Sequence, residues 1–438
     1  MTLTPATTAL TAFWAGLHVF QHGMAVSGLN GIQAPLSCGL AGGASNEDLP
    51  PWLDWIRPCV PMTPTEFGFA VSIFTLGGLV SSLASRSVIH SYGVVGALRL
   101  SALFVLVGNA LLSLANSVPQ MSAARTLVGL GCGISTTTVP LVLASVAPAH
   151  IRRSVGLLNQ LFIVAGVLLG QALSFPLGYR YLWRFVPAVS VGIAVVQLLG
   201  SAFVHVPDEE EAPASPEAEP LLAAAAGRPA NLSFTELIQS KEPRIQRAFY
   251  VVLVTQFCQQ ITGISAVMYF STRIMTPVFP GSAKVVALAI VMWKLPITAS
   301  PAFLIERVGV KPLLILPTFI MAAASLVLAL GINGSTGPLA IAGIMVFVTA
   351  FSVGLGPVVW VVIGDIVPPH ARAATSSIGL AVNWSTNFVI GVSFLPLQAW
   401  LSGGQPSGEG NVFYVFAVTC FLAAVWIQRA YASFEALT

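Results

Sequence analysis

The chain has 438 residues, of which 55% are hydrophobic and only 8% are charged, and its formal net charge at pH 7 is +3. A soluble domain usually carries about 25% charged residues, so this chain has too few to cover a surface that faces water. Its apolar runs are long and continuous, whereas a transmembrane β-barrel shows short alternating segments. The composition therefore predicts an all-α polytopic membrane protein.

Apolar stretches long enough to cross a bilayer, which takes roughly 20 residues, recur twelve times along the chain. In chain order they are 8–30, 64–84, 97–116, 120–144, 154–176, 184–205, 247–276, 284–304, 312–331, 338–364, 374–398 and 411–430. The start, MTLTPATTAL, lacks the basic region of a cleavable signal peptide, so we expect the first span to serve as a signal anchor.

The distribution of lysine and arginine predicts the orientation, because cytoplasmic loops of membrane proteins are enriched in both. With the N-terminus in the cytoplasm, the cytoplasmic side holds Arg86, Arg99, Arg152, Arg153, Arg228, Lys241, Arg244, Arg247, Arg307, Lys311, Arg372 and Arg429. The opposite side holds Arg57, Arg180, Arg184, Arg273 and Lys284. We therefore expect both termini to be cytoplasmic.

Residues 207–246 divide the chain into two halves of six spans, 1–206 and 247–438. The linker opens PDEEEAPASPEAEPLLAAAAGRPA, a composition that cannot build a core. Ser233 and Glu236 then have the spacing of a capping box, which predicts a short surface helix.

A short motif recurs in the two halves: VAPAHIR at 146–152 and IVPPHAR at 366–372. Each copy follows an even-numbered span, the fourth and the tenth. A parallel repeat of six helices is typical of transporters whose substrate site lies at mid-membrane between the halves.

Amide side chains occur inside three of the spans, where they are costly unless they are hydrogen-bonded. They are Asn159, Gln160 and Gln171 in the fifth span, Gln256, Gln259 and Gln260 in the seventh, and Asn383 and Asn387 in the eleventh. Single amides often only hold helices together. Amides on three helices instead favour a shared polar cavity that binds a molecule rich in hydroxyls.

These segments resemble the sugar porter family of the major facilitator superfamily, and particularly its glucose facilitators. The similar stretches are LNQL at 158–161, QQITGIS at 259–265, LIERVGVKPL at 304–313, and GPVVW, PPHAR and NWSTNF between 356 and 388. The resemblance covers nearly the whole membrane part. It implies the major facilitator fold, a central cavity between the two halves, and transport of a hexose-like sugar by alternating access.

Carried over by position, the resemblance places Gln160, Gln259, Gln260, Trp360, Asn383 and Asn387 around the sugar. Amides suit this role because each can donate and accept at once, as a sugar hydroxyl does. The indole would cover an apolar face of the sugar.

Three family positions are changed, and the changes bear on selectivity. Ser265 and Lys294 stand where the family has asparagine, and Ser352 stands where it has a glutamate or another polar group. Lys294 could snorkel or cap a carbonyl, hold an acidic group of the substrate, or act as a protonatable switch.

Coupling to protons is not favoured. Proton symporters of the family carry an aspartate in the first helix beside an arginine of the fourth; here Ala25 takes the aspartate position and Arg125 remains. Facilitated diffusion is therefore the preferred interpretation. The alternative is proton-coupled transport of a sugar, sugar acid or polyol that uses Lys294 or His22.

The cytoplasmic gate is partly kept. By resemblance, the gating residues are Arg152, Glu306, Arg307, Asp365 and Arg372. Uncharged HSYGVV at 90–95 and Ser145 replace charged family residues in the N-terminal half. Either the inward-facing state is more populated here, or other contacts replace those charges.

Cys38 and Cys59 share the first outer loop, where a disulfide is plausible, while Cys132, Cys258 and Cys420 lie within spans. The spacing of a dileucine sorting signal is found at Glu217, Leu221 and Leu222. Such a signal would recruit sorting adaptors. It favours a vacuolar or lysosomal membrane, with the plasma membrane as a nearly equal alternative.

We find no Walker loop, nucleophile elbow or metal-ligand cluster in the sequence, so we expect neither an enzyme nor a cofactor, a metal or a nucleic-acid partner. A non-transporting sugar sensor is the remaining alternative. Family sensors carry a long cytoplasmic tail, whereas here the sequence after the last span is short.

Overall fold

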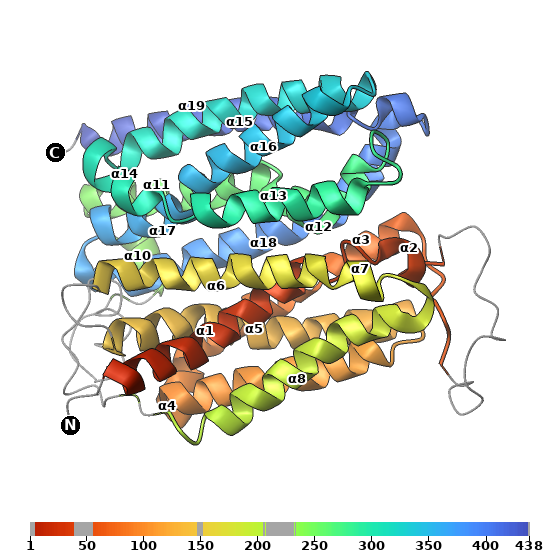
Figure 1. Cartoon of the computed structure of the whole chain (residues 1–438). Helices are drawn as coiled ribbons and strands as arrows, with labels where there is room; N and C mark the ends of the chain where they lie inside the picture. Colours follow the sequence, from red (N-terminus) through yellow and green to blue (C-terminus); the bar gives the residue numbers. More distant parts are fainter. Residues whose placement is uncertain are drawn as a thin grey trace.

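The computed structural model describes residues 5–38, 56–146, 152–204, 206, 232 and 234–436, and these are nearly all helical. Two helical bundles lie side by side, one built from helices that precede residue 201 and one from helices that follow residue 242 (Figure 1). The predicted all-α polytopic fold in two halves is confirmed.

The elements of the N-terminal half are α1 (Pro5–Ser27), α2 (Gln33–Leu36), α3 (Pro64–Ser72), α4 (Phe74–Ser113), α5 (Val118–Val146), α6 (Arg152–Ala172), α7 (Ser174–Leu177), η3 (Arg180–Arg184) and α8 (Phe185–Gly200). At 1.5 Å per residue, 40 residues of α4 would extend about 60 Å, twice the hydrocarbon thickness of a bilayer. Gly93 has a φ of 68° inside α4, so the element contains two spans that join at this glycine.

The elements of the C-terminal half are α11 (Pro243–Ile261), α12 (Ile264–Met275), α13 (Ala283–Ile297), α14 (Pro301–Val308), α15 (Val310–Asn333), α16 (Gly337–Val353), α17 (Leu355–Ile366), α18 (Pro369–Ser402), η4 (Pro406–Gly408) and α19 (Asn411–Glu435). Three expected spans are interrupted helices here, made of α11 with α12, α13 with α14, and α16 with α17. Such breaks free backbone groups, which neighbouring side chains must then satisfy.

Within the described part of the chain, nine helical stretches are long and apolar enough to cross a membrane. One of them, Pro64–Ser113, has 50 residues and covers the second expected span and most of the third. The first and eighth expected spans coincide with α1 and with α13 and α14, which are not among the nine. Each of the twelve predicted spans therefore overlaps a helix.

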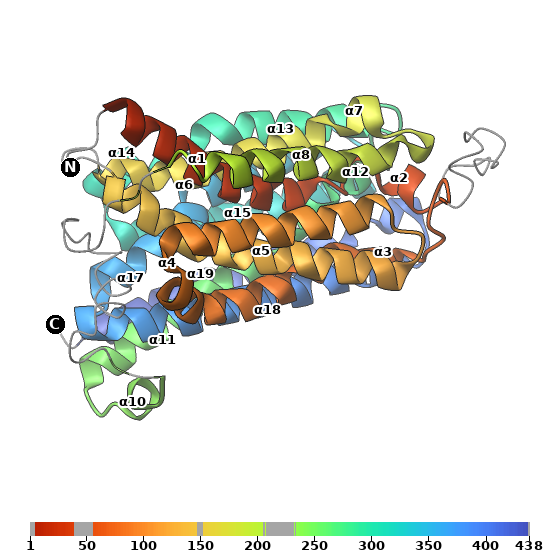
Figure 2. The ribbon, with the colours of Figure 1, turned by 90° about the horizontal axis from the view of Figure 1, so that it is seen from below.

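Large apolar side chains cover much of the outside of the bundles, as contact with lipid requires. Among the most exposed are Leu199, Phe203, Leu316 and Trp400. α1 begins and α19 ends at the same end of the molecule (Figures 1 and 2).

Little of the linker is described. The short helix expected there is α10 (Phe234–Gln239), and the N–H of Leu232 donates to the carbonyl of His370, 2.9 Å away, at the start of α18. Ser233 of the expected capping box and the dileucine pattern at Glu217, Leu221 and Leu222 lie outside the described residues.

At the end opposite the termini, a disulfide joins Cys38 to Cys59, with Cα atoms 5.2 Å apart. Val60 donates its N–H to the carbonyl of Leu36, and Trp183 donates its indole N–H to the carbonyl of Pro58, both over 2.8 Å. These bonds tie the segment after the disulfide to the N-terminal half. Cys132, Cys258 and Cys420 are free thiols and are buried.

Candidate functional site

Four amide side chains of α11 and α18 form one hydrogen-bonded cluster, which we call the amide cluster: Gln256, Gln259, Gln260 and Asn383. Asn383 Nδ2 donates to Gln259 Oε1 at 2.6 Å and to Gln256 Oε1 at 2.9 Å. Gln260 Nε2 donates to Asn383 Oδ1 at 3.0 Å. All four side chains are buried. Glutamines on successive turns of α11 thus converge on a single asparagine of α18.

The chain breaks directly after the amide cluster. Gly263, between α11 and α12, has a φ of 87°, a left-handed conformation that favours glycine. A Cβ at this position would also lie 2.7 Å from the ring of Phe416. The break turns Ser265 back toward the cluster, where its hydroxyl donates to Gln260 Oε1.

A second break supplies the acceptors for Gln259. α16 ends at Val353 and α17 begins at Leu355, and Gln259 Nε2 donates to the carbonyls of Leu355 at 2.7 Å and Gly356 at 3.0 Å. Trp360 lies four residues after Gly356 and so on the same side of α17. The side chain of Trp360 is 37% exposed and therefore not sealed in the core.

Aromatic side chains of both halves meet next to the amide cluster. The ring of Trp384, which adjoins Asn383, stacks on His22 with centroids 5.5 Å apart and meets Phe74 edge-on at 6.2 Å. Tyr269 Oη donates to Asn387 Oδ1 at 2.7 Å. This arrangement places the expected residues Asn387 and His22 close to the cluster.

Two buried donors of the site have no partner among the described residues: Trp384 Nε1 and Gln256 Nε2. Buried N–H groups are rarely left unpaired, and an unsatisfied one costs roughly 1–3 kcal/mol. A hydroxyl-bearing ligand would provide acceptors for them.

Arg125 of α5 is buried with 2% of its surface exposed, and backbone carbonyls take the place of an acidic partner. Its guanidinium donates to the carbonyls of Ala25 at 2.8 Å, Val71 at 2.7 Å and Ala70 at 3.4 Å. It also lies 4.4 Å from the ring centroid of Phe74. No carboxylate within the described ranges pairs with Arg125.

Lys294 of α13 is also buried, with 7% of its surface exposed. Its Nζ lies 3.7 Å from Met268 Sδ and 5.4 Å from the ring centroid of Phe351. Neither neighbour is a strong acceptor. Ser352, which follows Phe351, bonds to the carbonyl of Val348 in its own helix at 2.8 Å.

Gln160 is half-buried on α6. Across the described residues, no hydrogen bond joins it to the amide cluster. The structure thus brings together Gln259, Gln260, Ser265 and Asn383 directly, with Asn387 and His22 beside them. Within the described ranges, neither Gln160 nor Trp360 makes a hydrogen bond to the cluster.

Hydrogen bonds between the halves lie at the end opposite the termini. Asn30 Nδ2 donates to Ser271 Oγ at 2.7 Å and to the carbonyl of Met268 at 3.3 Å, while Asn30 Oδ1 accepts from the N–H of Thr272 at 3.1 Å. Gln171 Nε2 donates to Thr272 Oγ1 at 3.0 Å. α12 is therefore fastened to the N-terminal half at this end.

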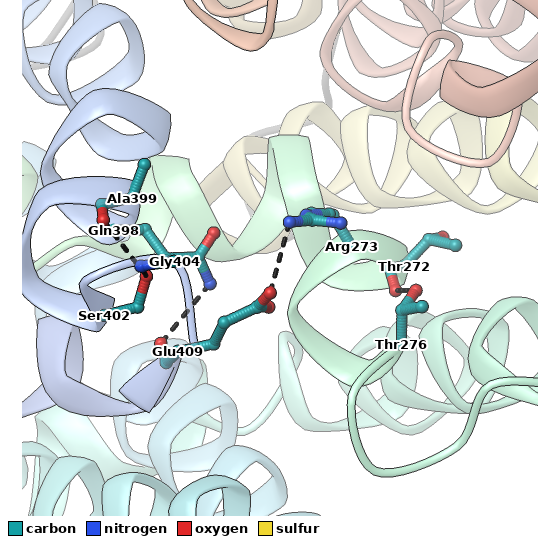
Figure 3. Close-up of polar contacts among 8 residues, drawn as sticks. All are labelled: Thr272, Arg273, Thr276, Gln398, Ala399, Ser402, Gly404 and Glu409. Atoms are coloured by element: carbon teal, nitrogen blue, oxygen red, sulfur yellow. Dashed lines mark hydrogen bonds and ion pairs between the residues drawn. The ribbon is translucent and has the colours of Figure 1, made fainter. Parts of the chain in front are cut away.

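At the same end, an ion pair joins α12 to the rest of the C-terminal half. Arg273 Nη2 lies 3.2 Å from Glu409 Oε1, and Gln398 Nε2 donates to the backbone carbonyl of Glu409 at 3.3 Å (Figure 3). Glu409 precedes α19, so the pair connects α12 with the turn between α18 and α19. The sequence analysis did not single out this contact.

The expected gating residues lie at the end where the termini are. Arg372 donates to the carbonyls of Val367 at 2.8 Å and Gly364 at 2.9 Å, and so caps the end of α17. Asp365 and the pair Glu306–Arg307 are exposed. Arg152 begins α6, but its side chain is outside the described set.

Comparison with known proteins decides the family. The sequence profile of the family described as "Sugar (and other) transporter" matches residues 7–435. The chain belongs to this family. The resemblance to sugar porters of the major facilitator superfamily is confirmed.

Two relatives illustrate the range of the family. The mouse protein named solute carrier family 2, facilitated glucose transporter member 7, is 30% identical over 395 residues, which cover 82% of this chain and 75% of the relative. The Saccharomyces cerevisiae vacuolar protein sorting-associated protein 73 is 25% identical over 465 residues, which cover 94% of this chain and 91% of the relative.

The inward-open structure of the xylose transporter XylE from E. coli superimposes with a TM-score of 0.73. The identity is 19%, and the match covers 97% of this chain and 95% of that one, so the likeness shows the fold.

The sequence predicted Gln256 as one of the amides of the seventh span, but it did not predict three further residues of the site: Tyr269, Trp384 and Asn30. Tyr269 and Asn30 depend on contacts between distant helices, which no local pattern reveals.

Proposed function

We propose that this protein carries a hexose-like sugar across a membrane by alternating access and facilitated diffusion. The observation that carries the proposal is the convergence of Gln256, Gln259 and Gln260 on Asn383 beside two unpaired donors. Neutral amides offer donors and acceptors without a charge that needs a counter-ion. Gln160, Trp360 and Asn387 are proposed to complete the sugar site from the neighbouring helices.

Facilitated diffusion is favoured over proton coupling because the position beside Arg125 carries no acid. Arg125 bonds to the backbone carbonyl of Ala25, whose methyl side chain cannot exchange a proton. The name of the mouse relative, a facilitated glucose transporter, agrees with this choice.

The alternating-access proposal rests on the uneven distribution of contacts between the halves. Asn30 and Gln171 hold the halves together at the end opposite the termini. If both termini are cytoplasmic, as the loop charges favour, the protein is closed toward the outside. Arg152, Glu306, Arg307, Asp365 and Arg372 would then re-form contacts when the cytoplasmic side closes.

Liposomes containing the purified protein test the proposal. Labelled hexose should enter to the external concentration and exchange with unlabelled hexose, and a pH gradient should not drive accumulation. Liposomes with the Asn383→Ala variant are the control, because uptake through the proposed site should be weaker in them. Binding of hexose without entry would favour the sensor instead.

Proton coupling through His22 is the second candidate. The imidazole stacks on Trp384 and its Nδ1 has no partner among the described residues, so it borders the site and is free to take part in a hydrogen bond. Accumulation of hexose that follows an imposed pH gradient, and that the His22→Gln variant abolishes, would replace facilitated diffusion by this mechanism.

A vacuolar or lysosomal membrane is the proposed location, with the plasma membrane as the alternative. Support comes from the dileucine pattern at Glu217, Leu221 and Leu222, proposed to recruit sorting adaptors, and from the name of the yeast relative. A fluorescently tagged Leu222→Ala variant should move to the plasma membrane. An unchanged distribution would dismiss the motif.

A further inference from the structure

Lys294 is a buried cation for which the described residues provide no oxygen partner. Its ammonium group has three N–H donors, yet its neighbours in the described structure are a thioether, Met268 Sδ at 3.7 Å, and the ring of Phe351 at 5.4 Å. Glu409 pairs with Arg273 and Glu435 with Lys311, so neither of these carboxylates serves Lys294. The structure therefore does not support a lysine that caps a carbonyl.

The depth of Lys294 argues against a side chain that escapes to water. α13 begins at Ala283, so Lys294 lies about 16 Å further along the helix, which is half of a hydrocarbon layer about 30 Å thick. An ionisable residue at this depth is costly and usually serves substrates or ions.

Lys294 adjoins the sugar site through α12. Met268, whose sulfur lies 3.7 Å from Lys294 Nζ, follows Ser265 by three residues and so lies on the same face of the helix. Ser265 donates to Gln260 of the amide cluster. A ligand of hexose size that contacts Gln260 could thus reach the ammonium group.

We propose that Lys294 binds a carboxylate of the substrate, so that the site accepts a hexuronate, a hexose-sized sugar with one negative charge. This inference rests on the proposed function, since it uses the same site. Buried charges are tolerated when they are paired. One ammonium matches one carboxylate, whereas a hexose phosphate would bring a second negative charge that Lys294 cannot balance.

Arg125 adds to the positive character of the site. It lies 4.4 Å from the ring centroid of Phe74, and Phe74 meets Trp384 and Tyr269 edge-on. No carboxylate of the described residues pairs with either cation. Arg125 is already bonded to the carbonyls of Ala25, Ala70 and Val71, so it adds to the positive potential while Lys294 alone is left to bind a carboxylate.

Uptake by liposomes containing the full chain tests the inference with three substrates: glucose, glucuronate and glucose 6-phosphate. The variants are Lys294→Gln, which removes the charge, and Lys294→Arg, which keeps it. Lys311→Gln is the matched control, because it removes one charge from a lysine that pairs with Glu435 on the exposed surface.

The wild type and Lys311→Gln should take up glucuronate in preference to glucose 6-phosphate. Lys294→Gln should raise the KM for glucuronate at least about tenfold more than it raises the KM for glucose, the equivalent of about 1.4 kcal/mol. Lys294→Arg should retain most of the glucuronate uptake. Competition of glucuronate with labelled glucose for uptake by the wild type should show, without a variant, that both sugars use the same site.

Membrane potential provides an independent readout. An inside-positive potential of ~100 mV is worth about 2.3 kcal/mol for one charge, so glucuronate should accumulate about 50-fold while glucose only equilibrates. Glucose uptake without glucuronate uptake or competition, or glucuronate uptake unchanged by Lys294→Gln, overturns this inference and leaves the proposed function standing. Uptake of neither sugar overturns both.

Discussion

Arg125 donates a 2.8 Å hydrogen bond to the backbone carbonyl of Ala25, and this contact joins α5 to α1 where the family's symporters carry an aspartate. Two further carbonyls, of Ala70 and Val71, receive the remaining bonds of the guanidinium. Because backbone carbonyls hold the arginine, its bonding does not depend on a proton. Residue 25 of α1 thus offers Arg125 a backbone carbonyl and no ionisable side chain, which supports the proposed passive mechanism.

The Ala25→Asp variant should introduce proton coupling. A carboxylate at residue 25 would lie beside the buried guanidinium, which can pair with the ionised form and release it on protonation. Hexose uptake in liposomes should become dependent on pH, and an inward proton gradient should drive accumulation above the external concentration.

Ala25→Asn is the matched control for this variant, because it has the same size and cannot ionise. Its uptake should remain independent of pH. If Ala25→Asp and Ala25→Asn show the same pH profile, the absence of an acid at residue 25 does not explain passive transport.

Asn383→Ala should damage the site more than any other single truncation in α18. It removes the group that Gln256, Gln259 and Gln260 share, and each unsatisfied buried amide costs roughly 1–3 kcal/mol. We expect the KM for hexose to rise at least about tenfold and the thermal midpoint to fall.

Ser393→Ala, on the same helix, serves as the control. The Ser393 hydroxyl bonds to the carbonyl of Val389 in its own helix. Its loss should leave hexose uptake unchanged. Equal effects of the two substitutions would show that Asn383 acts only through the stability of α18.

Tyr269 and Asn387 should act as a pair. Their 2.7 Å hydrogen bond joins α12 to α18, and its net worth is about 0.5–1.5 kcal/mol. Tyr269→Phe and Asn387→Ala should each raise the KM for hexose several-fold. The double variant should be little worse than Asn387→Ala, and a double-mutant cycle on KM measures the coupling. Additive effects would mean that the bond does not serve sugar binding.

Asn30→Ala should open the end opposite the termini. The side chain makes three hydrogen bonds to α12, each with a net worth of about 0.5–1.5 kcal/mol. Loss of these bonds should raise the ratio of molecules that are open at this end to molecules that are closed there by about tenfold or more. Spin labels at the exposed positions Leu114 and Gln405, one in each half, should report longer distances.

Asn109→Ala is the control for this shift, because the Asn109 amide bonds to the carbonyl of Val105 in its own helix. The label distances should not change in it. An unchanged distribution in Asn30→Ala would show that other contacts hold the halves together.

Local patterns were enough to predict the spans. Long apolar runs specify membrane helices because lipid offers no hydrogen-bond partners, so backbone N–H and C=O groups must bond to one another. The glutamine pair at 259–260 could likewise be assigned to a polar site, since an amide in hydrocarbon must find a partner. The short helix α10 before residue 243 likewise followed from the capping-box spacing of Ser233 and Glu236.

The partners of these polar groups were decided by the tertiary structure alone. The sequence singled out Arg125, Lys294 and Asn383, but it did not reveal their partners. Backbone carbonyls hold Arg125, and three glutamines share Asn383. Lys294 lies beside Met268 and Phe351. Membrane depth is a property of one helix and can be derived from its own residues. A hydrogen bond between helices depends on how distant segments pack, and the breaks at Gly263 and Gly354 set that packing here.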